Sequence, residues 1–227
     1  LIKGLSYLGK KLIINIMGGS AYIIKDWIDC ADSVIMSFYS GLEGGNALAD
    51  IISGDINPAG KLPFTVAEKA EDYPDFLHLG TKDKNIEYSY YHGYTLFDKK
   101  GIEPHFPFGF GLSYTAFELT CISCEKSEDK IKVTVKVTNK GEVDGDEVIQ
   151  IYVGSNNKET DRPVKVLKGF KRISVKAGES LSAEVDVLID DIKFYNPENA
   201  DWELDESYTV YVGTDSKKVT AAGKISF

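Results

Sequence analysis

The sequence predicts an α/β segment followed by an all-β segment within 227 residues. Up to about residue 65, short continuous apolar runs alternate with helix-like stretches, which is typical of a buried parallel sheet. After about residue 118, apolar and polar residues alternate within strands that turn residues separate, which is typical of an antiparallel sheet. We therefore predict a partial parallel α/β sandwich over 1–65, an irregular connector over 66–117 and a β-sandwich over 118–227.

The first segment reads as strand, helix, strand, helix. Apolar runs at 12–17 and 33–39 predict the strands, and Ser20 is expected to cap a helix over 21–30. Glycines turn the chain at 41–45, and a second helix over 46–53 should end at Gly54. This order predicts parallel pairing through a right-handed crossover. Because two parallel strands alone make no stable domain, we expect the last two strands of a larger sheet, whose other strands precede Leu1 or come from another chain.

Regular periodicity fades over 66–117, which is rich in Tyr, Phe, Gly and Pro. The aromatic content argues against disorder, so an ordered connector lying across other surfaces is expected. Beyond it, 131–138 alternates with period two and Asn139-Lys140-Gly141 turns the chain. Further strands are expected at 148–153, 180–187 and 208–212. The all-β segment has the size of one immunoglobulin-like sandwich, about 100 residues.

Charge and cysteines exclude several classes of protein. A net charge of −9, without a basic block, argues against nucleic-acid binding. No apolar run reaches the roughly 20 residues of a membrane helix, so no membrane is expected as a partner. Cys121 and Cys124 form a CxxC without the second pair that a zinc ribbon needs. Their neighbours alternate as in a strand, so the thiols are expected on opposite faces, unable to pair easily. The odd cysteine count favours a reducing, cytoplasmic compartment.

Motifs for metal or cofactor binding are not found. His78, His92 and His105 lack the spacing of metal-binding motifs and are assigned to the surface or the connector. Gly18-Gly19 lacks the Lys-Ser/Thr or the third glycine of a phosphate loop. The sequence therefore predicts no metal site and no cofactor.

Several motifs in register resemble one enzyme family. Residues 39–65 read YSGLEGGNALADIISGDINPAGKLPFT, which resembles the signature of family 3 glycoside hydrolases. Gly18 and Trp27 fall where that family usually has Gly and Trp. Residues 106–115 are similar to its entry into a fibronectin type III-like domain, and stretches at 137–141, 145–153, 167–170, 177–179 and 208–213 fit that domain. Thr95 departs from the pattern, because the family usually has Arg after Gly-Tyr.

The resemblance implies the C-terminal portion of a retaining β-glycosidase, most similar to the β-glucosidases. It implies an Asp nucleophile on a separate (α/β)8 barrel and a Glu acid/base on a loop of the sandwich domain. Both would lie outside this chain, so the implied partners are the barrel and the missing sandwich strands, from the same gene or a companion chain. The implied substrate is a β-linked glucoside or oligosaccharide. The sugar, the linkage, the domain order and a nicked, split or truncated origin stay open.

Three residues are candidates for the edge of a substrate site. Glu43 follows the second predicted strand, and Ser20 and Tyr39 share the same edge. Ligands of open α/β sheets collect at the carboxyl ends of strands. For Glu43 the preferred interpretation is structural, because a carboxylate suits the N-terminus of the following helix. Glu87, within a Tyr-rich stretch, is also interpreted structurally, through aromatic packing.

No catalytic residue is therefore expected in the chain itself. The alternative hypothesis is a non-catalytic carbohydrate-binding or structural β-sandwich module. Such a module would not need the first 65 residues, and this favours the enzyme.

Overall fold

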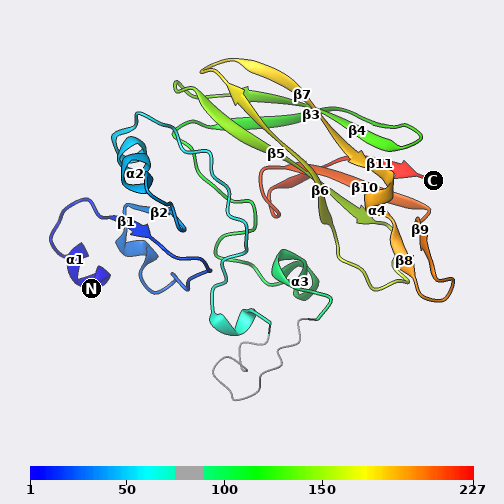
Figure 1. The fold of residues 1–227 in the computed structure, drawn as a ribbon, viewed down its shortest axis with the longest axis horizontal. Helices are drawn as coiled ribbons and strands as arrows, with labels where there is room; N and C mark the ends of the chain where they lie inside the picture. Colours follow the sequence, from blue (N-terminus) through cyan, green and yellow to red (C-terminus); the bar gives the residue numbers. More distant parts are fainter. Residues whose placement is uncertain (75–88) are drawn as a thin grey trace.

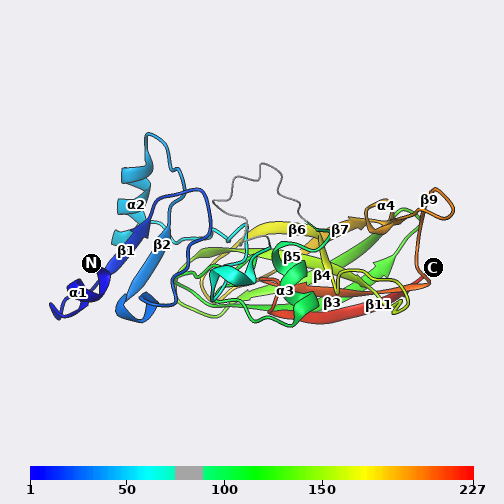
Figure 2. The same ribbon diagram turned by 90° about the horizontal axis from the view of Figure 1, so that it is seen from below.

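A computed structural model describes residues 1–74 and 89–227. A small α/β part, residues 1–65, lies at one end of the molecule, and an elongated β-sandwich extends to the other end (Figures 1 and 2). The predicted fold class is confirmed, because a short parallel sheet is followed by antiparallel sheets.

The α/β part contains two parallel strands and one longer helix. Its elements are α1 (Ile2–Ser6), β1 (Ile13–Ile16), the 3₁₀ turn η1 (Ile28–Cys30), β2 (Ser33–Met36) and α2 (Gly44–Ser53). Strands β1 and β2 pair in parallel from Ile13↔Ser33 to Ile16↔Met36, as predicted. Helix α2 ends at Gly54, whose φ of 87° is the left-handed conformation that glycine adopts most readily.

The helix predicted over 21–30 is wrong. Ser20 makes no helix cap, and after an extended stretch only η1 is helical. The backbone N–H groups of Trp27 and Ile28 both donate to the carbonyl of Ile24, at 3.1 and 2.9 Å. Aromatic and β-branched residues at 22–24 lower the helix propensity of this segment, and burial of the Ile24 side chain, 4% exposed, fixes the turn instead.

The parallel sheet is poorly covered within the described structure. Of residues 1–64, only Gly18 and Ile24 are buried, and no residue of β1 or β2 is. Ile13 is 45% and Met17 is 66% exposed. Parallel sheets normally have both faces covered, so this sheet has the exposure expected of a fragment of a larger one.

The connector is ordered where it is described, and it contains a helix that the sequence analysis missed. After η2 (Ala70–Asp72), α3 (Gly93–Lys100) begins directly after His92 and buries Leu96 and Phe97. Val66 pairs with Phe106 in an isolated antiparallel bridge. The Phe106 and Phe110 rings stack with centroids 4.7 Å apart. One contact of the connector with the β-sandwich is the hydrogen bond that the Leu167 backbone N–H donates to the Tyr94 hydroxyl at 2.9 Å.

Two antiparallel sheets enclose the main core. One has the strand order β3-β4-β7 and the other β11-β10-β5-β6. Their inward-facing side chains, mainly Val and Ile, are almost completely buried. A short helix and a hairpin precede the last two strands. The bounds are β3 (Phe117–Lys126), β4 (Lys130–Asn139), β5 (Gly145–Ser155), β6 (Val166–Val175), β7 (Ser180–Leu188), α4 (Ile189–Ile192), β8 (Phe194–Asn196), β9 (Asp201–Glu203), β10 (Ser207–Gly213) and β11 (Val219–Ser226).

A β-bulge corrects the prediction for the CxxC. Cys121 lies opposite Val135 and Cys124 opposite Val133, because the register shifts and leaves Ile122 unpaired. Both thiols therefore pack against the same core, not on opposite faces. They are unbonded, and burial raises the pKa of Cys124 to about 11.

Candidate functional site

The carboxyl ends of β1 and β2 form one edge, because the strands are parallel. The backbone N–H of Ser37 donates to the Ile16 carbonyl at 2.9 Å, which joins the chain leaving β2 to the end of β1. The Tyr39 ring lies against Gly19, where an added Cβ would come within 2.7 Å of it. Ser20 is exposed beside this contact and Tyr39 is 81% exposed. The structure thus brings Tyr39 to the loop that carries Ser20.

Phe38 has an unusual backbone at this edge. Its φ of 52° lies in the left-handed region, which bulky side chains rarely adopt. Its ring contacts Phe64 edge-on, with centroids 5.9 Å apart. Strained backbone of this kind persists where the surrounding structure requires it and is concentrated at functional sites. Sequence reasoning missed Phe38, since an apolar residue after a strand carries no signal of a positive φ.

Glu43 occupies the N-cap position of α2 after a turn at Gly41, whose φ is 70°. Its Oε2 accepts a hydrogen bond from Asn46 Nδ2 at 2.6 Å. The carboxylate therefore bonds to a side chain of the first helical turn rather than to a backbone N–H, and its charge suits the helix N-terminus. Its exposure means that α2 leaves the carboxylate open to solvent or to another chain segment.

A second set of contacts, the junction clamp (Asn57, Lys61 and Glu147), joins the α/β part to the β-sandwich. Asn57 Oδ1 accepts from the Ser113 hydroxyl at 2.9 Å and from the Tyr114 backbone N–H at 2.8 Å. Its Nδ2 donates to the Asp144 carbonyl at 2.9 Å. Lys61 and Glu147 form an ion pair of 2.6 Å, with side chains only 14% and 9% exposed.

In the sequence analysis, residues 55–60 carry only the family resemblance. The structure gives them a further role, because Asn57 bonds to two polar groups at the end of the connector, on Ser113 and Tyr114, and to the Asp144 carbonyl of the β-sandwich. The sequence signal for this contact was that the GDINPAGK stretch and the later GLSYT stretch both belong to the family resemblance.

A third contact ties the connector to the segment after β1. Lys25 and His105 both contact the Glu68 carboxylate, His105 Nδ1 at 3.1 Å. Hydrogen bonds from Lys25 first and His105 second lower the pKa of Glu68 below its ordinary value. His105 therefore has a structural partner, and within the described ranges no three His, Cys, Asp or Glu side chains form a group suited to a metal ion. His78 and Glu87 lie outside the described residues.

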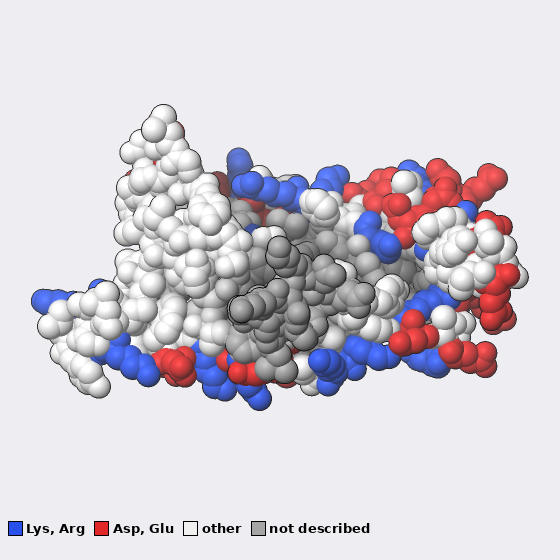
Figure 3. Space-filling view, turned by 60° about the horizontal axis from the view of Figure 1, so that its bottom comes forward, with Lys and Arg blue, Asp and Glu red and all other residues white. Residues whose placement is uncertain are grey.

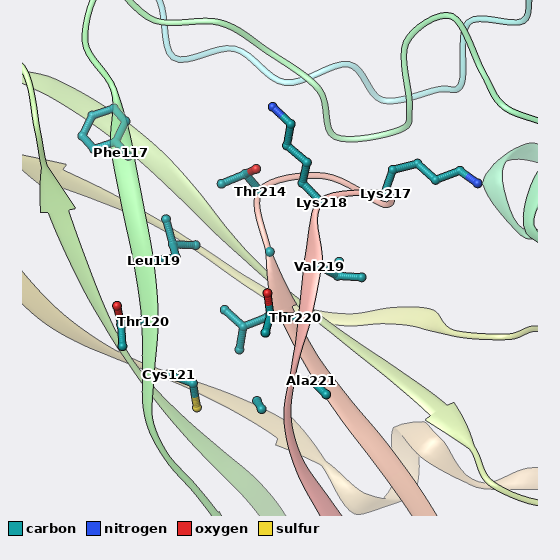
Figure 4. A pocket seen from close by; sticks show the side chains of 13 residues that line it. Phe117, Leu119, Thr120, Cys121, Thr214, Lys217, Lys218, Val219, Thr220 and Ala221 are labelled. Atoms are coloured by element: carbon teal, nitrogen blue, oxygen red, sulfur yellow. The ribbon is translucent and has the colours of Figure 1, made fainter.

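A hollow away from this edge lies between β3 and β11 (Figure 4), with a volume of about 570 Å³. Leu119, Cys121 and Val219 contribute to its wall, and Lys217 and Lys218 lie at one end. None of its 13 lining residues carries a carboxyl group. Glycoside hydrolysis by the usual two-carboxylate design therefore has no acid in this groove.

No helix among the described residues is long and apolar enough to span a membrane. In Figure 3, few charged side chains cover the visible face of the α/β part, whereas acidic side chains gather at the far end of the β-sandwich.

Two parts of the chain match models of known protein families. Residues 1–114 match the glycosyl hydrolase family 3 C-terminal domain, and residues 147–216 match a fibronectin type III-like domain. The chain is 34% identical over 226 residues to thermostable beta-glucosidase B of Acetivibrio thermocellus, covering 96% of this chain and 30% of that protein. It is 37% identical over 198 residues to a beta-glucosidase of Kluyveromyces marxianus, covering 85% and 23%.

Comparison with solved structures also finds beta-glucosidases. A beta-glucosidase from Kluyveromyces marxianus superposes with a TM-score of 0.92 at 33% identity, over 99% of this chain and 27% of that one. Beta-glucosidase 3B from Thermotoga neapolitana, solved with glucose, gives a TM-score of 0.87 at 30% identity, over 100% and 34%. The chain therefore spans about a third of the length of these relatives. It belongs to glycosyl hydrolase family 3, as the C-terminal part of a β-glucosidase-like protein.

Proposed function

We propose that this chain is the non-catalytic C-terminal part of a retaining β-glucosidase that removes terminal β-linked sugars. The nucleophilic Asp and the acid/base Glu belong to the remainder of the enzyme, either in the same polypeptide or in a companion chain. The single observation that carries the proposal is the uncovered parallel sheet, whose carboxyl edge presents Tyr39 at 81% exposure. Ligands of open α/β sheets bind outside such edges.

The exposed surface of the α/β part supports the presence of a covering partner. Apolar side chains that a finished domain would bury are open here, including Leu8 at 66% and Leu42 at 98% exposure. Several large apolar side chains exposed on one small part of a chain mark a surface that contacts protein. The remaining strands of the sheet and the barrel are the proposed cover, in agreement with relatives about three times as long.

Ser20, Tyr39 and Glu43 would border the substrate crevice without taking part in bond breaking. A retaining mechanism needs two carboxyl groups about 5–5.5 Å apart. Glu43 is bonded to Asn46, so its carboxylate is already used to organise α2. Its proposed task is to fix the start of that helix beside the crevice.

Hydrolysis of an aryl β-glucoside tests the proposal. The 227-residue chain alone should show no turnover, and the complete enzyme should release the β-anomer first, as judged by NMR. Glu43→Gln in the complete enzyme should retain turnover, with Glu43→Asp as the charge-preserving control. A loss of about 10²–10⁴-fold in Glu43→Gln, smallest for substrates with good leaving groups, would identify Glu43 as the general acid and refute the assignment.

The compartment remains a prediction. All three thiols are unbonded, and this favours a reducing environment, proposed here to be the cytoplasm.

A further inference from the structure

An exposed aromatic pair lies on the β8–β9 hairpin. Tyr195 and Trp202 are directly cross-strand partners, with ring centroids 5.8 Å apart and planes at 67°. They are 51% and 61% exposed. Figures 1 and 2 place this hairpin at the end of the molecule opposite the α/β part. A large exposed aromatic pair far from the junction is not explained by the core or by the proposed cover.

Polar contacts brace the hairpin beneath these rings. Glu203 accepts hydrogen bonds from Asn196 Nδ2 at 2.9 Å and from Asn199 Nδ2 at 2.5 Å. The Arg162 guanidinium lies 3.2 Å from the centroid of the Phe194 ring. Arg162 also pairs with Asp205, whose side chain is 4% exposed. The aromatic pair is therefore held in place before any ligand arrives, which lowers the entropic cost of binding.

The chemistry around the rings suits a neutral polyhydroxylated ligand. Aromatic faces carry negative charge density and stack against weakly positive C–H groups, such as those of a pyranose ring. Glu203 follows Trp202 directly in β9, so its side chain points to the other face of the hairpin and braces the strands instead of meeting the ligand. Glu198, exposed in the turn between the two strands, offers carboxylate oxygens as acceptors for hydroxyl groups.

Charge excludes the main competing occupants. Glu198, Asp201 and Glu206 are exposed on or next to the hairpin, and Figure 3 shows acidic side chains gathered at this end. Anionic polymers and anionic lipid surfaces are repelled by such a rim. A second copy of the chain docked through the same hairpin would bring like charges together. A neutral glycan is subject to neither of these electrostatic repulsions.

We propose that Tyr195 and Trp202 form an accessory binding site for a β-linked glucan chain, separate from the site that cleaves the sugar. The inference rests on the proposed function for its ligand class. Because the hairpin lies far from the α/β edge, it suits an extended polymer that reaches beyond the crevice, rather than the terminal sugar alone.

Native affinity electrophoresis of the 227-residue chain tests the site without any need for catalysis. A soluble mixed-linkage β-glucan in the gel should retard the chain, and an α-glucan should not. Trp202→Ala and Tyr195→Ala should each weaken retention by about tenfold, the scale expected for one aromatic contact. Phe170→Ala is the matched control, because Phe170 is a sandwich aromatic that is 69% exposed and lies on β6.

Fluorescence gives an independent measurement, since Trp27 and Trp202 are the only tryptophans in the sequence. In a Trp27→Phe variant, β-glucan should shift the emission of Trp202 and protect it from iodide quenching. Equal retention of wild type and both hairpin variants, or equal loss in Phe170→Ala, would overturn the proposal. So would a change in self-association on Trp202→Ala without glucan binding. Failure of aryl-glucoside hydrolysis by the complete enzyme would instead refute the proposed function and leave this binding result standing.

Discussion

Lys61→Met should strongly destabilise the contact between the two parts of the chain. Lys61 and Glu147 pair at 2.6 Å with side chains 14% and 9% exposed. Lys61 Nζ also donates to the Gly111 carbonyl at 3.3 Å. The methionine keeps the aliphatic stem of Lys61 and removes only its charge. Glu147 then stays largely buried, and among the described residues its remaining hydrogen-bond donor is the backbone N–H of Val148, at 2.7 Å.

The expected loss is about 3 kcal/mol in the free energy of unfolding, since breaking a buried pair by removing one partner costs roughly 3–5 kcal/mol. The double variant Lys61→Met/Glu147→Leu should recover most of this loss, because neither charge remains buried. Lys140→Met is the control. Its pair with Glu118 is 2.7 Å long but 56% and 57% exposed, and exposed pairs contribute about 0–1 kcal/mol.

Urea unfolding followed by circular dichroism measures the effect. With a slope of about 1–3 kcal/mol per molar urea, Lys61→Met should lower the midpoint by about 1–3 M. An unchanged midpoint, or a double variant as unstable as the sum of the two single variants, would refute the reasoning.

Four further predictions concern the connector, the bulge and α2. Asp98→Asn should lower the free energy of thermal or urea unfolding by about 3 kcal/mol. Lys165 Nζ lies 2.5 Å from Asp98 in a side chain that is 8% exposed, so it would lose its counter-charge. An effect below that of Lys140→Met would contradict this prediction. Cys124, with its pKa raised to about 11 by burial, should react with iodoacetamide at pH 8 about 100-fold more slowly in the folded than in the denatured chain, as peptide mapping can measure. The raised pKa of Cys124 also stabilises the folded chain at pH values below 9, the pKa of the thiol in the unfolded chain, and this contribution is lost as the pH rises from 9 to about 11. A free energy of unfolding that shows no such loss over this pH range would contradict the prediction. Gly54→Ala should lower the free energy of unfolding by about 1 kcal/mol, because its φ of 87° strains any Cβ, whereas Gly45→Ala, which meets no close atom, should not.

Much of the fold could be predicted because local patterns agree with the final packing. Strand β4 alternates cleanly, and its Ile131, Val133, Val135 and Val137 are fully buried. Helix α2 lies between glycine turns and ends at Gly54 as expected. The parallel pairing followed from the order of elements, and with it the common edge of Ser20 and Tyr39.

Features that depend on distant contacts could not be predicted from the sequence. Helix α3 is short and its burial depends on Leu96 and Phe97 meeting other surfaces. The segment 21–30 is held by the burial of Ile24 rather than by its own propensity. Asn57 and Ser113 are 56 positions apart, so no window along the chain reveals their bond. The role of the edge residues in substrate binding also depends on parts of the enzyme that this chain does not contain, and it stays a prediction.

The interruptions in the strand pairing have a consequence for solubility. Beside Ile122 in β3, register shifts leave Lys168 unpaired in β6 and Ala222 unpaired in β11. Strands β3, β6 and β11 are three of the four strands at the margins of the two sandwich sheets. A regular margin offers a row of free N–H and C=O groups on which another molecule can add a strand, and a bulge twists and breaks that row. The fourth margin, β7, has no such shift against β4 but exposes Glu184 and Asp186. The β-sandwich is thereby protected against the edge-to-edge growth that begins aggregation.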